Sequence, residues 1–145
     1  MNNFDERQDL IRGKIFTHMF IIMAVLLFLN AFLNSIDIIW ADGFHSSILI
    51  LMAATMIGSI EMIVRDVYFR NKRESLMAWF FVGIGIFLFI LSVRHMIGGE
   101  SIISGGTITD EGFSFILSVI FLSIGAIGAI KFLIDRKRER KGEES

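Results

Sequence analysis

Residues 56–73 read MIGSIEMIVRDVYFRNKR, and this stretch decides the fold because an apolar run passes directly into a basic segment. The apolar part contains one ionisable side chain, Glu61, and the part from Arg65 onward contains four of the 14 Lys and Arg residues of the chain. Basic residues collect on the cytoplasmic side of membrane helices, where they remain in water. The stretch therefore predicts the cytoplasmic end of a membrane-spanning helix.

Further apolar runs of similar length lie on both sides of this stretch. Hydrophobic residues make up 54% of the 145-residue chain and its mean hydropathy is +0.65, which is more apolar than a soluble domain of this size. About 20 apolar residues cross the ~30 Å hydrocarbon core of a bilayer. We predict spans at residues 15–35, 47–64, 76–93 and 112–134, all fully helical because the chain has no proline. The expected fold is an all-α integral membrane protein, a four-helix transmembrane bundle in one membrane domain surrounded by lipid.

The distribution of positive charge along the chain predicts its orientation. Thirteen of the 14 Lys and Arg residues precede the first span, lie between the second and third, or follow the fourth, and only Arg94 falls on the other side. The positive-inside rule therefore places both termini and the middle loop in the cytoplasm, with residues 135–145 as a basic cytoplasmic tail. A cleavable signal peptide is not expected, because the first apolar run is longer than the apolar core of such a peptide.

Small residues recur on three of the predicted spans at spacings that favour close helix packing. The second span contains Ala54 and Gly58 in a small-x-x-x-small pattern, and the third carries Ala78, Gly85 and Ser92 at seven-residue intervals. The fourth span has a similar face of small residues, made of Ser114, Ser118, Gly125, Gly128 and Ala129. Each of these faces is predicted to contact a neighbouring helix.

The segments that lead into the first two spans carry helix-start signals. Residues 1–14 either form a short helix in the membrane interface or extend the first span. Ser46 or Ser47 is predicted to cap the second span, because a serine hydroxyl accepts hydrogen bonds from the free amides of a first helical turn. The loop between these spans holds Trp40, a residue typical of the membrane interface.

Two later connections contain turn signals. Asn71 and Glu74 form a capping-box pattern before the third span, which predicts a tight turn and hence an antiparallel pair of the second and third spans. Residues 101–109, SIISGGTIT, alternate β-forming and polar residues around Gly105 and Gly106. They fit either a hairpin with a two-residue turn or a flexible loop.

Glu61 is the one acidic residue inside a predicted span, and an intramembrane carboxylate is a functional candidate by default. Arg65 follows it by one helical turn in the favourable order, and His18 lies at a similar predicted depth in the first span. One interpretation is structural: Arg65 and His18 neutralise Glu61 and tie two helices together. The other is functional: Glu61 binds a proton or a cation, and His18 changes charge near neutral pH.

A second polar cluster is predicted near the opposite membrane surface. Its members are Asn30, Asn34, Arg94 and His95, which lie near the end of the first span and at the end of the third. The asparagines are typical of hydrogen bonds between helices. Arg94 is expected to form a rim ion pair with Asp37 or Glu100, or to bind an anionic headgroup or peptide.

The sequence lacks the residue patterns of common catalytic sites. It has no cysteine, which excludes disulfides, thiolate metal sites and thiol catalysis. His18, His45 and His95 fall at different predicted depths, so no joint metal site is expected. No Ser-His, acidic metal-binding or nucleotide-binding pattern is present. We therefore expect neither an enzyme nor a cofactor or metal, and no nucleic-acid partner.

Two functional hypotheses follow from the span pattern. The first is a non-enzymatic accessory or regulatory subunit that acts through helix–helix contacts with a membrane-protein partner or with a second copy of itself. The second is a small oligomeric proton-coupled exporter that uses Glu61. The small multidrug resistance transporters also have four spans and a membrane glutamate, but theirs lies in the middle of the first span, so we do not assign the chain to them.

The segment before the first span carries a short motif, Asp5-Glu-Arg-Gln-x-x-Ile-Arg-Gly-Lys14. The motif resembles the start of small, uncharacterised four-span membrane proteins of Gram-positive bacteria. The resemblance covers about ten residues, and the span pattern covers the rest of the chain. It implies a four-span fold and a location in the bacterial cytoplasmic membrane, but no activity and no site residues.

Overall fold

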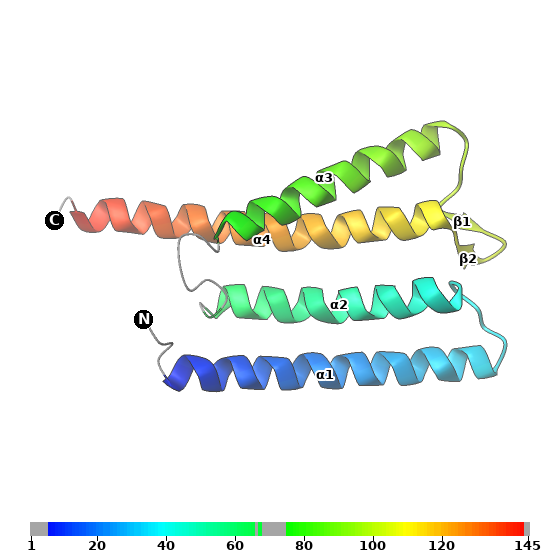
Figure 1. Ribbon diagram of the computed structural model, residues 1–145, viewed down its shortest axis with the longest axis horizontal. Coiled ribbons are helices and arrows are strands. Elements are labelled where there is room, and N and C mark those ends of the chain that lie inside the picture. The colour runs from blue at the N-terminus through cyan, green and yellow to red at the C-terminus, as the bar shows by residue number, and fades with distance from the viewer. Residues whose placement is uncertain (1–5, 66, 68–74, 144–145) are drawn as a thin grey trace.

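Four long helices make up most of the chain (Figure 1). The computed structural model describes residues 6–65, 67 and 75–143. The helices are α1 (Glu6–Ser35), α2 (Gly43–Val64), α3 (Ser75–Ile97) and α4 (Asp110–Glu143), and two short strands, β1 (Ile103–Ser104) and β2 (Thr107–Ile108), connect α3 to α4. Each helix contains a segment long and apolar enough to cross a membrane. The four predicted helices are therefore confirmed, and they indicate a multi-pass membrane protein.

The helices extend beyond the predicted spans. α1 is continuous from Glu6, so residues 6–14 extend the first span and do not form a separate helix. α4 continues to Glu143, through most of the predicted tail. The predicted capping pair Asn71 and Glu74 lies outside the described residues.

The start of α2 differs from the prediction because another residue caps it. Asp42 is the N-cap, and its Oδ1 accepts a hydrogen bond from the backbone N–H of His45 at 2.7 Å. A carboxylate satisfies a free amide of the first turn and also interacts favourably with the positive end of the helix dipole. The helix therefore begins at Gly43, and the predicted caps Ser46 and Ser47 are its fourth and fifth residues.

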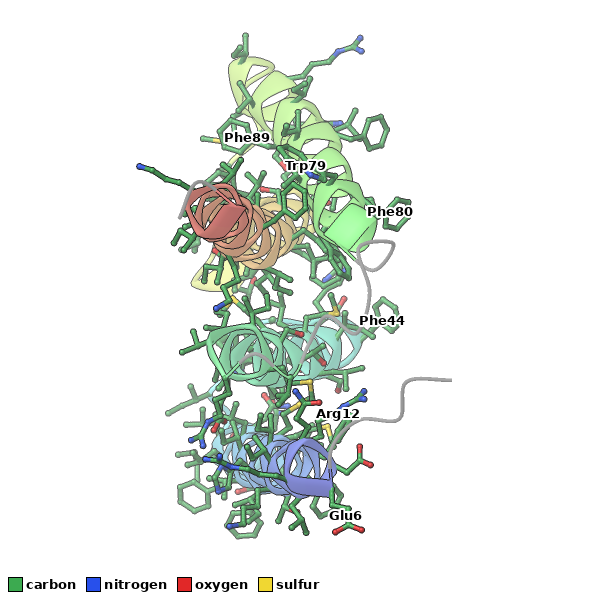
Figure 2. The ribbon with its side chains drawn as sticks, turned by 90° about the vertical axis from the view of Figure 1, so that its left-hand side faces the viewer. Glu6, Arg12, Phe44, Trp79, Phe80 and Phe89 are labelled. Atoms are coloured by element: carbon green, nitrogen blue, oxygen red, sulfur yellow. The ribbon has the colours of Figure 1, made fainter. Side chains whose placement is uncertain are left out.

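The helices of the predicted four-helix bundle form a single open row (Figure 2). α1 packs on α2, α2 packs on α4, and α4 packs on α3, so the order in space differs from the order in the chain. The predicted pairing of the second span with the third is wrong, because α4 lies between α2 and α3 (Figure 2). α1 and α3 form the two edges of the row.

The α3–α4 contact uses the small residues that the sequence analysis singled out. A methyl group at Gly85 of α3 would lie 2.8 Å from Cγ and 2.9 Å from the backbone N of Leu122 in α4, so the two helices approach closely there. Ser92 and Ser118 are fully buried, and each donates its hydroxyl to a carbonyl of its own helix. Gly85 and Ser92 confirm the predicted packing face of the third span.

The α1–α2 contact also depends on a small-residue face. A side chain at Gly58 would overlap Met19 of α1, and Ala54, one turn earlier, is buried. The predicted Ala54–Gly58 packing pattern is therefore confirmed. One turn nearer the ends of the helices that hold Glu6 and Val64, Ile15 of α1 packs in a buried apolar cluster with Met62 and Val67, and this cluster holds the two helices together.

Residues 101–109 form the hairpin, and this resolves the alternative that the sequence left open. β1 and β2 are antiparallel, with Ile103 opposite Ile108, and the two turn residues Gly105 and Gly106 have φ angles of 59° and 86°. Such angles favour glycine and are those of a hairpin turn. The hairpin is also anchored, since the N–H of Ile108 donates to the carbonyl of Trp40 in the α1–α2 loop at 2.8 Å.

The row therefore has two distinct ends. We call the end that holds residues 36–42 and the hairpin the hairpin end, and the end that holds Glu6 and Arg65 the basic end. The candidate polar residues gather at these two ends.

Candidate functional site

At the basic end, the structure brings Glu61, Arg65 and His18 together. Glu61 Oε1 accepts an ion-paired hydrogen bond from Arg65 Nη2 at 2.8 Å, and Glu61 Oε2 lies 3.7 Å from His18 Nδ1 across the α1–α2 contact. Arg65 is the C-cap residue of α2, and its N–H donates to the carbonyl of Glu61 at 3.0 Å. Both carboxylate oxygens of Glu61 therefore face a basic partner.

This arrangement is suited to fixing two helices. The Glu61 side chain is 24% exposed, whereas those of Arg65 and His18 are 53% and 58% exposed. Ion pairs with partners this exposed contribute at most about 1 kcal/mol. A surface groove of about 430 Å³ beside the cluster is lined by His18, Lys14 and their neighbours on α1, and Glu61 does not line it.

At the hairpin end, Asn30 forms a link between α1, the loop and α2. Its Oδ1 accepts a hydrogen bond from Trp40 Nε1 at 2.7 Å, and its Nδ2 donates to the hydroxyl of Ser46 at 3.3 Å. Both polar groups of the amide are used, as expected for hydrogen bonding between helices. Asn30 is therefore a structural residue in the described chain.

The four residues of the predicted outer cluster are not brought together. Asn30 and Asn34 lie on α1, whereas Arg94 and His95 lie on α3 at the opposite edge of the row (Figure 2). Equal depth in a membrane does not place helices side by side, and α2 and α4 separate these two. Among the described residues, the ion-pair partner of Glu100 is His95, where Arg94 was predicted.

A different cluster forms at the hairpin end from His95, Glu100 and Glu111. His95 Nδ1 lies 2.6 Å from Glu100 Oε2, and one ligand atom from each of the three residues lies within 4.8 Å of the other two. The three come from the last turn of α3, the following turn and the first turn of α4. Imidazole nitrogens and carboxylate oxygens are both common metal ligands, so this is the residue set in the described chain that could hold a cation.

Local backbone structure positions these side chains. The N–H of Glu100 donates to the carbonyl of His95 at 3.2 Å, in a turn that Gly99 closes with a φ of 94°. This pattern is a common helix C-terminus and folds Glu100 back over the last turn of α3. At the start of α4, the Thr109 hydroxyl accepts from the N–H of Gly112 at 3.1 Å and so caps the turn that carries Glu111.

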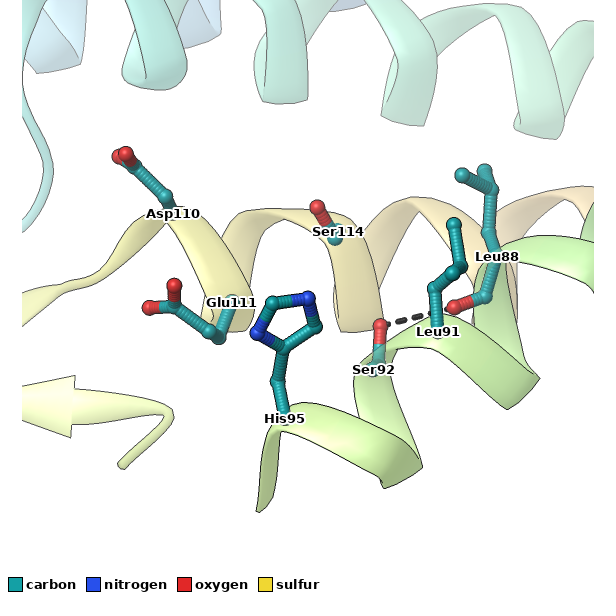
Figure 3. A pocket seen from close by; sticks show the side chains of 7 residues that line it. All are labelled: Leu88, Leu91, Ser92, His95, Asp110, Glu111 and Ser114. Carbon is teal, nitrogen blue, oxygen red and sulfur yellow. Dashed lines mark hydrogen bonds between the residues drawn. The ribbon is translucent and has the colours of Figure 1, made fainter. Parts of the chain in front are cut away.

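A small cavity adjoins this cluster between α3 and α4 (Figure 3). Its volume is about 130 Å³, and its wall combines the leucines of α3 with His95, Glu111 and the hydroxyls of Ser92 and Ser114. Figure 3 shows the His95 ring, carried by α3, pointing toward Glu111 and Ser114 of α4. The cavity can hold water molecules beside His95 and Glu111.

His45 makes a separate contact between α2 and α4. Its Nδ1 lies 3.2 Å from Asp42, its Nε2 lies 3.7 Å from Asp110, and its ring stacks on Phe113 at 4.3 Å between centroids. Both ring nitrogens are thus engaged by carboxylates, and the ring is largely covered. His45 therefore helps to hold the first turns of α2 and α4 together.

The sequence analysis named Glu100 only as a partner for Arg94 and missed Glu111, but the hairpin contains a signal that places the two together. The observed register pairs Ile103 with Ile108, and the N–H of Thr109 donates to the carbonyl of Ile102 at 3.1 Å. When this register is continued outward, Glu100 falls opposite Glu111. A firm hairpin prediction would therefore have placed the two carboxylates together.

Comparison of the chain with protein-family models, with curated proteins and with solved structures gave no match.

Proposed function

We propose that the protein is a non-enzymatic accessory or regulatory subunit of the bacterial cytoplasmic membrane, which binds the transmembrane helices of another membrane protein. The observation that carries this proposal is the open row of helices, in which α1 and α3 each pack extensively on one neighbour. Both edge helices therefore keep a wide apolar surface that a partner helix can cover.

The exposed surface of α1 has a pattern suited to helix association. Thr17, Ala24 and Ala31 are exposed and recur every seven residues, so they follow one face of the helix. Small residues let another backbone approach closely, and this is the main source of helix association in lipid, where no hydrophobic force drives helices together. Bulky side chains such as Phe20 and Phe28 flank this face and are exposed.

The orientation in this proposal follows from charge. The basic end would lie in the cytoplasm and the hairpin end outside, because nearly all Lys and Arg residues precede α1, lie between α2 and α3, or follow the apolar part of α4. A partner subunit would meet α1 or α3 within the membrane. The exporter hypothesis has less support, because both oxygens of Glu61 face basic partners near one end of the row.

Photocrosslinking in membranes of the native host tests the proposal. A photoreactive phenylalanine would replace Phe28 on α1 or Phe87 on α3, which are 75% and 63% exposed, and Ile57 on the central helix α2 as the matched control, which is 41% exposed. We expect one defined protein adduct from an edge position and none from position 57. Equal labelling at all three positions, or adducts with lipid alone, would refute the proposal.

A second pair of variants tests the close approach on α1. Ala24 on α1 and Ala126 on α4 are both exposed, and each is changed to leucine. Ala24→Leu should abolish the adduct at position 28, whereas Ala126→Leu should leave it unchanged. An adduct with the mass of two chains would instead identify a second copy of this protein as the occupant.

A further inference from the structure

His95, Glu100 and Glu111 combine two kinds of metal ligand at one end of the α3–α4 pair. The set contains one imidazole nitrogen and two carboxylates, and its ligand atoms lie within 4.8 Å of one another. Ligands bound at about 2.1 Å around a tetrahedral zinc ion are about 3.4 Å apart. The three atoms therefore lie near the spacing that such an ion requires. We propose that these three residues bind a divalent transition-metal cation of the Zn²⁺ class.

The backbone holds the three ligands close before any cation binds. Glu100 and Glu111 lie at the two ends of the hairpin segment, and the Thr109 hydroxyl donates to the carbonyl of Ser101 at 2.7 Å, which closes the base of this segment. A side chain at Gly112 would overlap the carbonyl of Ile102, so the segment lies directly against the first turn of α4. Preorganised ligands lower the entropic cost of binding.

The contact between His95 and Glu100 suggests how binding proceeds. Their 2.6 Å separation is that of a strong hydrogen bond, in which a proton lies between the imidazole and the carboxylate. A cation takes the place of this proton, and the two atoms move apart to the spacing of two metal ligands. The cation therefore replaces a contact that already joins two of its three ligands.

The cavity beside the cluster completes the coordination. Three protein ligands leave one position of a tetrahedral ion open, and water fills such positions in zinc proteins. The cavity of about 130 Å³ between α3 and α4 has room for this water, next to the hydroxyls of Ser92 and Ser114. His45 offers no equivalent site, because its two carboxylates lie at different ring nitrogens, Asp42 at Nδ1 and Asp110 at Nε2, and so do not converge on one position.

The mixed ligand set also predicts selectivity. Imidazole is a good ligand for zinc and other late first-row metals, whereas Mg²⁺ and Ca²⁺ prefer sites made of oxygen atoms alone. Zn²⁺ and Co²⁺ should therefore bind, and millimolar Mg²⁺ or Ca²⁺ should not displace them. Comparable displacement by Mg²⁺ would identify a general acidic surface and would overturn the proposal.

The test uses the full chain, purified with a tag that contains no histidine and placed in lipid nanodiscs. Zn²⁺ affinity is measured by competition with a coloured chelator, and Co²⁺ absorption reports the coordination. We expect one Zn²⁺ per chain and an affinity lowered at least about tenfold in His95→Gln and in Glu111→Gln, since even residues that only support metal ligands contribute this much. His45→Gln is the matched control and should bind as tightly as the unchanged protein.

Thermal unfolding without metal separates loss of ligands from loss of fold. Glu111 lies in the first turn of α4, so its substitution can also weaken that helix. Glu100 lies outside the helices, and Glu100→Gln therefore tests the same metal site without this effect. Folded variants that bind Zn²⁺ as tightly as the unchanged protein would overturn the proposal, as would a loss of binding in His45→Gln alone. The measurement is made on the isolated protein and so does not depend on the proposed partner.

Discussion

Gly85 and Gly83 offer a matched pair of substitutions that tests the α3–α4 contact. Both glycines lie in the middle of α3, two residues apart. A Cβ at Gly85 would lie 2.9 Å from the backbone N of Leu122, whereas a Cβ at Gly83 would have no atom within 4 Å. Gly85→Ala should therefore push α4 away, and Gly83→Ala should not.

The size of the effect follows from the overlap. An ordinary Cβ contact begins at 3.4 Å, whereas a Cβ at Gly85 would lie 2.9 Å from the backbone N of Leu122. In Gly85→Ala, α3 and α4 must therefore separate by about 0.5 Å at this position. Helix backbone cannot move aside as a flexible side chain can, and overpacking of this kind costs about 1–3 kcal/mol. The gain in helix propensity from glycine to alanine is similar at both positions, so it cancels in the comparison.

Thermal unfolding of the two variants in the same detergent measures this difference. For a chain of this size, 1 kcal/mol corresponds to about 2–4 °C in Tm, so Gly85→Ala should unfold roughly 2–12 °C below Gly83→Ala. Gly83→Ala should unfold at or slightly above the temperature of the unchanged protein. Equal unfolding temperatures for the two variants would show that α3 does not approach α4 at Gly85.

Two further predictions concern polar groups at the two ends of the row. Asp42→Ala removes the cap of α2 and should cost about 1 kcal/mol, with faster hydrogen exchange at the His45 amide, which donates to Asp42; unchanged exchange there would contradict the cap. Glu61→Gln should destabilise the protein by less than about 1 kcal/mol, because its partner Arg65 is half exposed. Chemical unfolding measures this cost, and a variant that fails to assemble would show that Glu61 contributes more than an exposed ion pair.

The sequence predicted the elements of the fold well because a bilayer imposes their length. Apolar runs of about 20 residues can satisfy their backbone only as helices, and all four helices are present. The hairpin was predictable as one of two alternatives, because Gly105 and Gly106 supply the positive φ angles of its turn. The packing faces at Gly58 and Gly85 were also predictable, since few other roles fit small residues at helical spacing.

The order of the helices could not be predicted from the same signals. A small-residue face shows where a helix packs but not which helix covers it, so Gly85 was compatible with α2 or α4 as its neighbour. The structure selects α4 through Leu122. The prediction of the outer cluster was wrong for the same reason. The sequence indicated the depth of its four residues in the membrane but not which helices lie side by side.

The basic-end cluster was predictable because two of its members lie on one helix. Glu61 and Arg65 are one turn apart on α2. His18 lies at a similar depth on α1, and it reaches Glu61 because α1 packs on α2, as a short loop between consecutive helices favours. The His95 cluster needed the hairpin register, which the sequence left undecided. Its members are separated along the chain by a turn whose geometry sets their distance.

An open row can be stable in a membrane where it would not be in water. In water, the exposed apolar faces of α1 and α3 would drive closure into a bundle, but lipid solvates them as well as a protein core does. The order of the row is instead fixed at the hairpin end, by Asn30 with Trp40 and Ser46 and by the hairpin strand on the Trp40 carbonyl. These polar contacts hold α1 beside α2 and leave its outer face uncovered. Helix contacts with a partner can therefore form on the edge helices without breaking the helix contacts of the described chain, which is the property that an accessory subunit requires.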